Sequence, residues 1–474
     1  MGCGINMNKL INKIKDNSVV VGIIGLGYVG LPLAMAFAKK FNVIGYDINE
    51  NTVTTLKSGK SHIKDVSPDV LNTYLGSSFH PTSNVDDLNK CDFFIICVPT
   101  PLNGYHEPNL RYVESAATMI SKILRKDQFV VLESTTYPGT TEEVLVSILE
   151  ESGLKASVHF GVAHSPERID PGNTSKVEDI PKVVGGINEE CTEIATMMYG
   201  AVLKHIVPVT NARTAEAVKI LENTFRCVNI ALINELSLIF DIMNINTWEV
   251  IQAAATKPYG FMSFYPGPGV GGHCIPLDPY YLSYQAKRLG FIPRFIEVAG
   301  EINHYMKIYT INVAREALHN VGKQLRNSNI AVFGLAYKKN INDARESPAS
   351  YVIESLKNHG ANVTVYDPYV NVFNTPFGTL SSQSSIEETL KDVDCAIFLV
   401  DHDEYRNIDP KTIIELMKHP IIVDCKNIFD KHDGIMCYGI GKGRIQHRNI
   451  DPKTMIKFEK HPIIADCRIY SINR

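Results

Sequence analysis

Short apolar runs alternate with helical patterns between residues 19 and 208. The apolar runs, which predict strands, cover residues 19–24, 43–47, 93–98 and 129–134. Residues 30–40, which follow the first run, have the pattern of a helix. Such alternation is typical of a parallel sheet covered by helices. Ligands of such sheets bind at the carboxyl ends of the strands, where this chain has turns rich in proline, threonine and glycine.

The middle of the chain predicts one long helix. No glycine or proline interrupts residues 211–243, and apolar residues recur there at intervals of three and four. The length of this helix suits a spine between two domains or a contact between two copies of the chain.

A second strand–helix pattern starts at residue 329. Strands are expected at 329–334, 363–367 and 395–400, and a helix at 350–358. The predicted fold class is therefore α/β, with two Rossmann-like, doubly wound parallel-sheet domains joined by a long central helix and a helical middle domain. The expected divisions are residues 1–208, 209–310 and 311–443, followed by a tail at 444–474.

The tail repeats an earlier segment of the chain. Residues 406–426 and 448–468 are identical at fifteen of twenty-one aligned positions. Two copies are too few for a repeat array. Because a sheet has one position for this helix–strand unit, we expect the second copy to lie outside the core. Alternatively, the two copies compete for that position, or one is exchanged between subunits.

Composition excludes several classes of function. The net charge of −4 over 474 residues provides no basic field for nucleic acid. Ten scattered cysteines include no CxxC pair and no Cys/His cluster at zinc spacing, which predicts reduced thiols in the cytoplasm and no metal site. Residues 19–38 carry no charge and are long enough to span a bilayer. Their four glycines and one proline favour instead a buried strand, a glycine turn and a helix, so we expect no membrane contact.

Gly25, Gly27 and Gly30 form a Gly-x-Gly-x-x-Gly motif between a predicted strand and a predicted helix. In a dinucleotide-binding loop the first glycine allows a tight turn, the second lets the pyrophosphate approach the backbone, and the third lets the helix pack on the strand. The amino end of the helix stabilises the phosphates. Asp47 ends the next strand, where its carboxylate would accept hydrogen bonds from the ribose and disfavour a 2′-phosphate. The expected cofactor is therefore NAD.

Cys274 lies in a glycine-rich loop, and Asp278 follows it by four residues. The glycines let the backbone approach a ligand, which favours a reactive thiol over a buried apolar one. Lys219 and Asn223 share one face of the long helix, where the lysine would stabilise an oxyanion and favour a thiolate. The alternatives are a solvated polar stripe for Lys219 and Asn223, and a turn cap for Asp278.

Thr135 and Glu167 each lie in a turn that follows a predicted strand. A threonine or glutamate in such a turn often caps it. The carboxyl end of a parallel strand is also where catalytic groups gather, so either interpretation is open for both residues.

Ordered motifs over residues 19–443 resemble those of the UDP-glucose/GDP-mannose dehydrogenase family. The motifs are Gly-Leu-Gly-Tyr-Val-Gly-Leu-Pro-Leu-Ala (25–34), Val-Pro-Thr-Pro (98–101), Glu-Ser-Thr (133–135), Ser-Pro-Glu-Arg (165–168), Lys219 with Asn223, Gly-Gly-His-Cys (271–274) and Ala-Tyr-Lys-Lys-Asn-Ile-Asn-Asp-Ala-Arg-Glu-Ser (336–347). Ser-Pro-Glu-Arg and the residues around His273 are most similar to the branch that acts on UDP-N-acetylhexosamines. The tail repeat has no counterpart in that family.

The resemblance implies that the first α/β domain binds NAD and the last binds a UDP-sugar. It implies that Cys274 is the nucleophile, that Lys219 and Asn223 stabilise the oxyanion, that Thr135 and Asp278 hold the catalytic water, and that Glu167 assists proton transfer. The implied contacts of NAD are Gly25, Gly27, Tyr28, Val29, Gly30, Asp47, Pro99, Thr100, Thr135 and Arg345. The implied contacts of the UDP-sugar are Glu167, Arg168, Lys219, Asn223, Tyr265, Gly271, Gly272, Tyr337 and Lys338.

The implied reaction is the NAD-dependent oxidation of a C6 hydroxyl to a uronic acid, through a thiohemiacetal and a thioester on Cys274. UDP-N-acetylglucosamine is the expected substrate, for cell-surface polysaccharide precursors, and UDP-glucose, UDP-N-acetylgalactosamine and UDP-N-acetylmannosamine are the alternatives. A single-hydride hydroxyacid dehydrogenase and a non-catalytic nucleotide-sugar binder are the rival functions. A homodimer through residues 211–243 is also expected.

Overall fold

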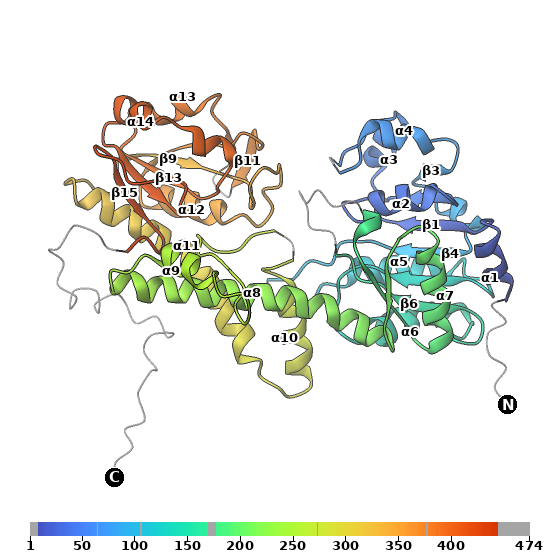
Figure 1. Ribbon diagram of the computed structural model, residues 1–474. Coiled ribbons are helices and arrows are strands. Elements are labelled where there is room, and N and C mark those ends of the chain that lie inside the picture. The colour runs from blue at the N-terminus through green and yellow to red at the C-terminus, as the bar shows by residue number, and fades with distance from the viewer. Residues whose placement is uncertain are drawn as a thin grey trace, which may run out of the picture.

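Two sheets, one in each half of the chain, carry the fold in the computed structural model (Figure 1). The structure describes residues 8–443 except 64, 105–106, 169–176, 273 and 376–377. His273 and the second copy of the repeat therefore lie outside the described residues. Within them, the predicted α/β class is confirmed.

The first sheet has eight strands in the order β3-β2-β1-β4-β5-β6-β7-β8. Its strands are β1 (Val20–Ile24), β2 (Asn42–Tyr46), β3 (Phe79–Thr82), β4 (Phe93–Ile96), β5 (Phe129–Leu132), β6 (Gly161–His164), β7 (Lys182–Gly186) and β8 (Ile206–Pro208). The four strands predicted from apolar runs are all present within two residues of the expected bounds.

One pair of strands departs from the expected parallel arrangement. β6 and β7 are antiparallel, with Ala163 opposite Gly186. Parallel neighbours need a crossover connection, usually a helix. The described residues between β6 and β7 contain only a short 3-10 turn (Val177–Asp179), so this connection has no crossover helix there.

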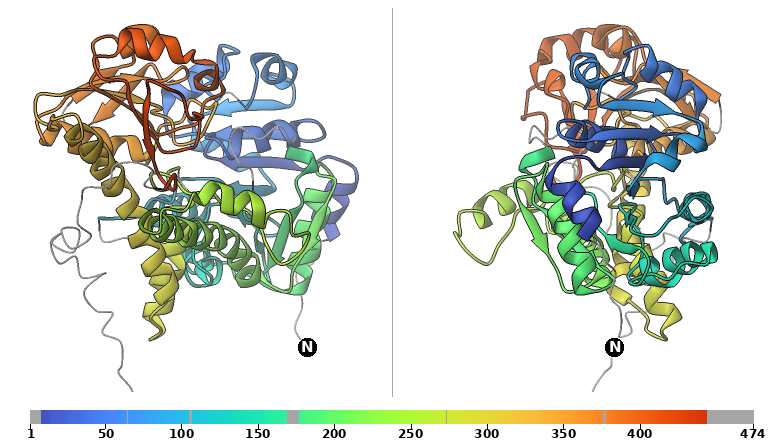
Figure 2. Two further views of the ribbon diagram at one scale, coloured as in Figure 1. Left: turned by 60° about the vertical axis from the view of Figure 1, so that its left-hand side comes forward. Right: turned by 90° about the vertical axis from the view of Figure 1, so that its right-hand side faces the viewer.

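Helices cover both faces of this sheet (Figure 2). α1 (Asn8–Lys15), α2 (Gly30–Ala38) and α7 (Glu189–Gly200) pack on one face, and α5 (Arg111–Ser121) and α6 (Val146–Leu149) on the other. α3 (Glu50–Lys57) and α4 (Pro68–Tyr74) lie near β3. Every residue of α2 is buried, which explains why residues 19–38 carry no charge. Among the described helices, none combines the length with the hydropathy that a bilayer span requires.

The central helix α8 (Ala212–Ile242) runs for 31 residues between the two sheet domains (Figure 1). It begins one residue later than predicted because the Asn211 side chain caps it, accepting a hydrogen bond from the Thr214 amide at 2.8 Å. The other helices of this region are α9 (Thr247–Ala254), α10 (Asp278–Arg288) and α11 (Arg294–His319). α10 and α11 both pack against α8.

The second sheet is wholly parallel, in the order β10-β9-β13-β14-β15. Its strands are β9 (Asn329–Phe333), β10 (Asn362–Tyr366), β13 (Cys395–Phe398), β14 (Ile421–Asp424) and β15 (Met436–Gly439), flanked by α12 (Pro348–Asn358), α13 (Ile386–Leu390) and α14 (Pro410–Leu416), with a small hairpin of β11 (Val372–Thr375) and β12 (Gly378–Ser381). The first copy of the repeat supplies α14 and β14, and β14 lies between β13 and β15.

The same kind of turn follows β1 in the first sheet and β9 in the second sheet. Gly25 after β1 has φ +94° and Gly334 after β9 has φ +92°. The amide of the next residue, Leu26 or Leu335, donates to an aspartate at the end of the neighbouring strand, at 2.9 Å and 2.7 Å respectively. The positive φ makes glycine the suited residue at both turns. Each sheet thus has a nucleotide-type turn at the same place.

Candidate active site

The glycine loop after β1 has the shape that a dinucleotide requires. A side chain at Gly25 would lie 2.7 Å from the Cys97 carbonyl oxygen, and one at Gly30 would lie 1.8 Å from the Gly25 carbonyl oxygen. Only glycine fits these two positions. No heavy atom lies within 4 Å of the place where a Gly27 side chain would start, so a pyrophosphate has room to reach this backbone. Together with the amino end of α2, these residues fit NAD.

Asp47 lies where the ribose of NAD is expected. It follows β2, is partly exposed, and accepts hydrogen bonds from the Leu26 and Asn49 amides, both at 2.9 Å. One backbone donor therefore holds each carboxylate oxygen, which orients the group and leaves further lone pairs.

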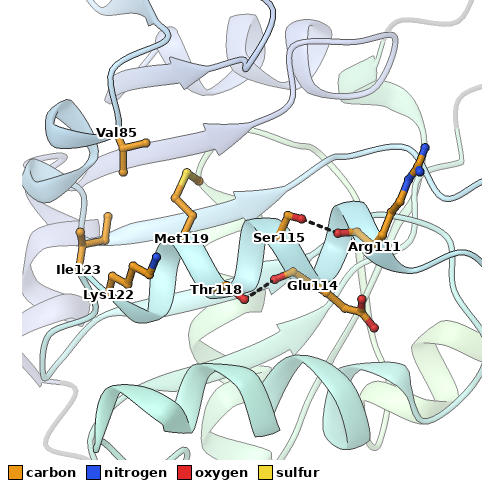
Figure 3. A pocket seen from close by; sticks show the side chains of 8 residues that line it. All are labelled: Val85, Arg111, Glu114, Ser115, Thr118, Met119, Lys122 and Ile123. Carbon is orange, nitrogen blue, oxygen red and sulfur yellow. Dashed lines mark hydrogen bonds between the residues drawn. The ribbon is translucent and has the colours of Figure 1, made fainter.

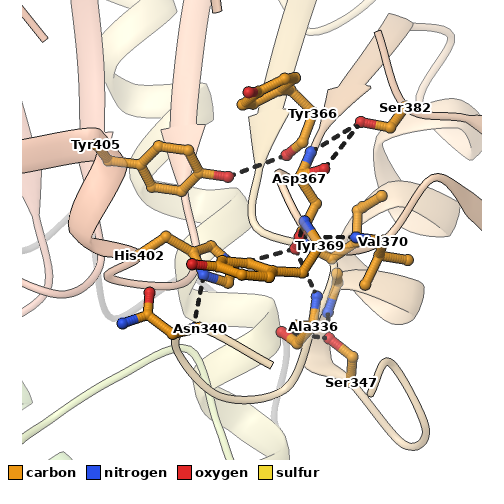
Figure 4. Close-up of polar contacts among 12 residues, drawn as sticks. Ala336, Asn340, Ser347, Tyr366, Asp367, Tyr369, Val370, Ser382, His402 and Tyr405 are labelled. Atoms are coloured by element: carbon orange, nitrogen blue, oxygen red, sulfur yellow. Dashed lines mark hydrogen bonds and ion pairs between the residues drawn. The ribbon is translucent and has the colours of Figure 1, made fainter. Parts of the chain in front are cut away.

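Asp367, the matching aspartate of the second sheet, is buried and hydrogen-bonded to its own domain (Figure 4). It is 2% exposed, and the His402 side chain lies 3.1 Å from it. Because His402 Nδ1 accepts from the Asn340 amide at 2.9 Å, His402 Nε2 carries the proton and donates to Asp367. Burial alone would raise the pKa of Asp367, but the bond from His402 and the backbone donors lower it below its usual value. This buried pair holds the loop that carries Tyr337 and Lys338.

The loop before Cys274 lies against that second-domain loop. The Gly272 amide donates to the Arg345 carbonyl at 3.2 Å. A side chain at Gly271 or at Gly272 would come within 2.9 Å of Tyr337. Glycines at these two positions therefore allow the cysteine loop to touch the predicted sugar-binding loop. Cys274 follows directly after His273, and the Asp278 amide donates to the Cys274 carbonyl at 2.8 Å, which joins the two residues in one turn.

Lys219, Asn223 and Asp278 form a buried polar group. Their residues are 7%, 5% and 4% exposed, so the alternative of a solvated stripe on the long helix is wrong. Asn223 Nδ2 donates to Asp278 Oδ2 at 2.5 Å, so the Asp278 carboxyl is directed to α8. Burial raises the pKa of Asp278 to about 7, against the opposing effects of Lys219 and Asn223. The carboxyl can therefore gain or lose a proton near neutral pH.

Arg168 connects the turn after β6 to α8. Its guanidinium pairs with Glu222 at 2.6 Å and donates to the Pro181 carbonyl at 2.7 Å. Glu222 is the neighbour of Asn223, so the turn that carries Glu167 is tied to the helix that carries the buried polar group.

Sequence reasoning missed the residues that surround Glu167. Lys182 Nζ lies 3.3 Å from Glu167 Oε2 and 2.6 Å from Glu133 Oε2. The signals were a lysine at the head of the apolar run that forms β7, and an acid in the Glu-Ser-Thr motif after β5. A charge inside an otherwise apolar strand is rarely buried unless it is paired.

The remaining predicted residues lie around this region. Pro99 and Thr135 are in the turns after β4 and β5, and the Thr100 carbonyl accepts a hydrogen bond from Tyr281 of α10. The Arg345 guanidinium lies 4.5 Å from the centre of the Tyr28 ring, which links the second nucleotide loop to the first. Tyr265 stacks on Trp248 with ring centres 5.5 Å apart, and it is 48% exposed.

A surface hollow lies elsewhere, over the side of α5 that faces away from the sheet (Figure 3). Its lining is Val85, Arg111, Glu114, Ser115, Thr118, Met119, Lys122 and Ile123. The hydroxyls of Ser115 and Thr118 bond to carbonyls of their own helix. None of the predicted site residues lines this hollow.

Three family descriptions match the chain. They are those of the UDP-glucose/GDP-mannose dehydrogenase family: the NAD binding domain over residues 19–203, the central domain over 213–305 and the UDP binding domain over 331–431.

Individual relatives are similar over most of their length. UDP-N-acetyl-D-mannosamine dehydrogenase of Pyrococcus horikoshii is 37% identical over 90% of this chain and 100% of its own. UDP-N-acetyl-D-glucosamine 6-dehydrogenase of Pseudomonas aeruginosa is 37% identical over 87% of this chain and 97% of its own. A solved UDP-D-ManNAc dehydrogenase from Pyrococcus horikoshii superposes with a TM-score of 0.84 at 36% identity, over 90% of this chain and 100% of that one.

Each of the three family descriptions covers one part of the site. The NAD binding domain contains the glycine loop, the central domain contains the cysteine loop, and the UDP binding domain contains the second nucleotide loop. The chain therefore belongs to the UDP-glucose/GDP-mannose dehydrogenase family, as an NAD-dependent dehydrogenase of UDP-sugars.

Proposed function

We propose that the chain oxidises the C6 hydroxyl of a UDP-N-acetylhexosamine to a carboxylate, with UDP-N-acetylglucosamine as its substrate. The observation that carries this proposal is the joining of Cys274 and Asp278 in one turn, with Asp278 buried against Lys219 and Asn223. A single-hydride dehydrogenase has no use for a placed thiol.

NAD, when bound at the glycine loop, supplies the hydride acceptor for two oxidations at C6. The Cys274 thiolate attacks the aldehyde carbon that the first oxidation leaves, and a thiohemiacetal forms. The Lys219 ammonium and the Asn223 amide stabilise its oxygen. After the second oxidation the sugar is a thioester of Cys274, so the reactive aldehyde does not escape.

Water then releases the acid from the enzyme. Thr135 and Asp278 hold the water, and Glu167 takes its proton. Arg168, Tyr265, Gly271, Gly272, Tyr337 and Lys338 bind the UDP-sugar, and Tyr28, Val29, Asp47, Pro99, Thr100 and Arg345 line the NAD side.

UDP-N-acetyl-D-mannosamine is the second candidate substrate. The solved relative with a TM-score of 0.84 is described as a dehydrogenase of that sugar. The two sugars differ in configuration at C2, so discrimination depends on contacts there.

We propose further that α8 joins two copies of the chain. Phe225, Leu232 and Ile239 are 46%, 49% and 44% exposed and stand seven residues apart, so they share one face of the helix. Phe291, in the connection between α10 and α11, adds exposed apolar surface to the same helical region. Apolar surface of this extent is typical of a protein interface.

A panel of UDP-sugars tests the function. Two NADH should form for each UDP-N-acetylglucosamine converted to the acid, where a hydroxyacid dehydrogenase would form one. Cys274→Ala should abolish acid formation and leave UDP-sugar binding within about twofold, because truncating an active-site thiol removes chemistry and little binding surface. Full uronate production by this variant would refute the proposed mechanism.

A further inference from the structure

A buried group of charged side chains lies directly behind Glu167. Lys182 of β7 lies between Glu133, which follows β5, and Glu167, which follows β6. The side chains of Lys182, Glu133 and Glu167 are 6%, 0% and 12% exposed. Tyr199 of α7 donates a hydrogen bond to Glu133 Oε1. Side chains from β7, the turn after β5 and α7 therefore form one connected group, which contacts Glu167 through Lys182.

The hydrogen bonds of Glu133 favour its charged form. Burial raises the pKa of Glu133, but one of its oxygens accepts from Tyr199 and the other from Lys182, and both contacts stabilise the carboxylate. Burial disfavours the charge of Lys182, but Glu133 and Glu167 outweigh this effect and raise the pKa of the lysine. Lys182 is therefore a cation shared by two carboxylates.

Among the described residues, three further titratable side chains lie near this group. Burial lowers the pKa of His164 to about 3, so its imidazole is uncharged. Burial raises the pKa of the Cys97 thiol well above its usual value, so it stays protonated. The Arg168 guanidinium bonds to Glu222 and to the Pro181 carbonyl.

Because Lys182 interacts with both Glu133 and Glu167, its interaction with Glu167 is the weaker of the two. The 2.6 Å contact goes to Glu133, and Glu167 has the longer contact of 3.3 Å. A lysine bound to Glu167 alone would stabilise its ionised form strongly and make it a poor proton acceptor.

We propose that Lys182 and Glu133 are positioning residues that hold Glu167 ready to accept a proton during hydrolysis of the Cys274 thioester. This inference rests on the proposed function. In the step concerned, the water oxygen bonds to the thioester carbon and a water proton passes to the Glu167 carboxylate. The carbon–sulfur bond breaks, and its electron pair remains on Cys274 as the thiolate.

A purely structural role explains the group poorly. Buried ion pairs pay a large desolvation cost, and apolar residues of similar volume usually give equal or greater stability. The contact between Lys182 and Glu167 instead indicates that the buried lysine takes part in the reaction.

Glu133→Gln tests the inference, because it leaves Lys182 to Glu167 alone. We expect hydrolysis to slow about tenfold and the acid limb of the kcat profile to move down by about one pH unit. The Cys274 thioester should accumulate, as mass spectrometry of rapidly quenched enzyme would show, while the first burst of NADH stays unchanged. Tyr199→Phe removes one hydrogen bond from Glu133, so this carboxylate binds Lys182 more strongly, and the profile should shift less and in the opposite direction.

Controls separate this effect from loss of stability. Glu150→Gln removes a surface carboxylate paired with Lys155 in the same domain and should behave as wild type. Lys182→Arg keeps the cation and should hydrolyse the thioester faster than Lys182→Gln.

The results for these variants show whether the proposed positioning role is wrong. If wild type forms acid and both Glu133→Gln and Tyr199→Phe keep its pH profile and thioester level, the inference is wrong even where their melting temperatures fall. If Glu133→Gln does not fold, Tyr199→Phe alone decides in the same way. If wild type forms no acid from any UDP-sugar, the proposed function fails instead.

Discussion

At the scale of single residues, the site includes an acid that the fold buries at a cost. Asp278 has its pKa raised to about 7 by burial, from a usual value of 3.8. A raised carboxyl pKa means that the folded state binds the proton more tightly than the unfolded state does. The contribution of this proton to stability is complete below pH 3.8 and is lost as the pH rises through about 7.

Asp278→Asn should therefore stabilise the fold while it impairs the reaction. The amide oxygen can still accept from Asn223, and no charge has to be buried. Relative to wild type, the variant should gain about 1.4 kcal/mol per pH unit between about pH 4 and pH 7, and the gain should be constant above that range. Urea unfolding at pH 5 and pH 8 measures it.

The exposed Asp430→Asn is a suitable control, with no such dependence expected. An Asp278→Asn variant that is less stable than wild type at pH 8 would contradict the physical account of this site.

The sequence revealed those site residues that are close along the chain. Lys219 and Asn223 share a helix face, and Cys274 and Asp278 share a turn, so their spacing already placed each pair together. Lys182 and Glu133 meet across strands, and their contact depends on the order of β5, β6 and β7. No local pattern reveals that order.

At the scale of elements, two buried amides hold the loop before Cys274. Asn234 of α8 is fully buried, its oxygen accepts from the Gly267 amide at 3.0 Å, and its nitrogen donates to Asn303 of α11 at 2.9 Å. The loop proposed to carry the UDP-sugar is therefore bonded to α8, at a side chain that α11 holds in place.

Asn234→Leu should loosen this loop. It leaves the buried Gly267 amide and the Asn303 oxygen without their partner, at a cost of about 1–3 kcal/mol. We expect the KM for the UDP-sugar to rise about tenfold and the KM for NAD to stay the same, as initial-rate kinetics would show. Asn320→Leu, which removes an exposed amide at the end of α11, is the control. An equal rise in both KM values would argue against a local effect.

For the strands and helices that were predicted, the bounds followed from apolar periodicity, since buried parallel strands read as continuous apolar runs. Six strands of the two larger sheets, namely β3, β6, β7, β8, β14 and β15, were not predicted. Apolar periodicity could not predict that β7 runs antiparallel to β6, because this periodicity is the same in both strand directions. The direction depends on the connection between the two strands, whose described residues lack a crossover helix.

At the scale of the whole molecule, the exposed stripe on α8 predicts a dimer. Phe225→Asp places a charge within the proposed contact, where burial of an unpaired carboxylate costs several kcal/mol. Analytical ultracentrifugation should show a dimer for wild type and a monomer for the variant at micromolar concentration. Val158→Asp, at an exposed position of the first domain, should leave the dimer intact. A dimeric Phe225→Asp would place the interface elsewhere.

The two nucleotide-type turns differ in how much of their aspartate is open to a ligand. Asp47 keeps a partly exposed carboxylate, whereas all of the capacity of Asp367 is taken up by four backbone amides and His402. The aspartate of the second turn therefore has no lone pair left for a ligand. The chain thus has one nucleotide-type turn with an open carboxylate, in the region that matches an NAD binding domain, and one turn whose carboxylate only holds its own loop, in the region that matches a UDP binding domain.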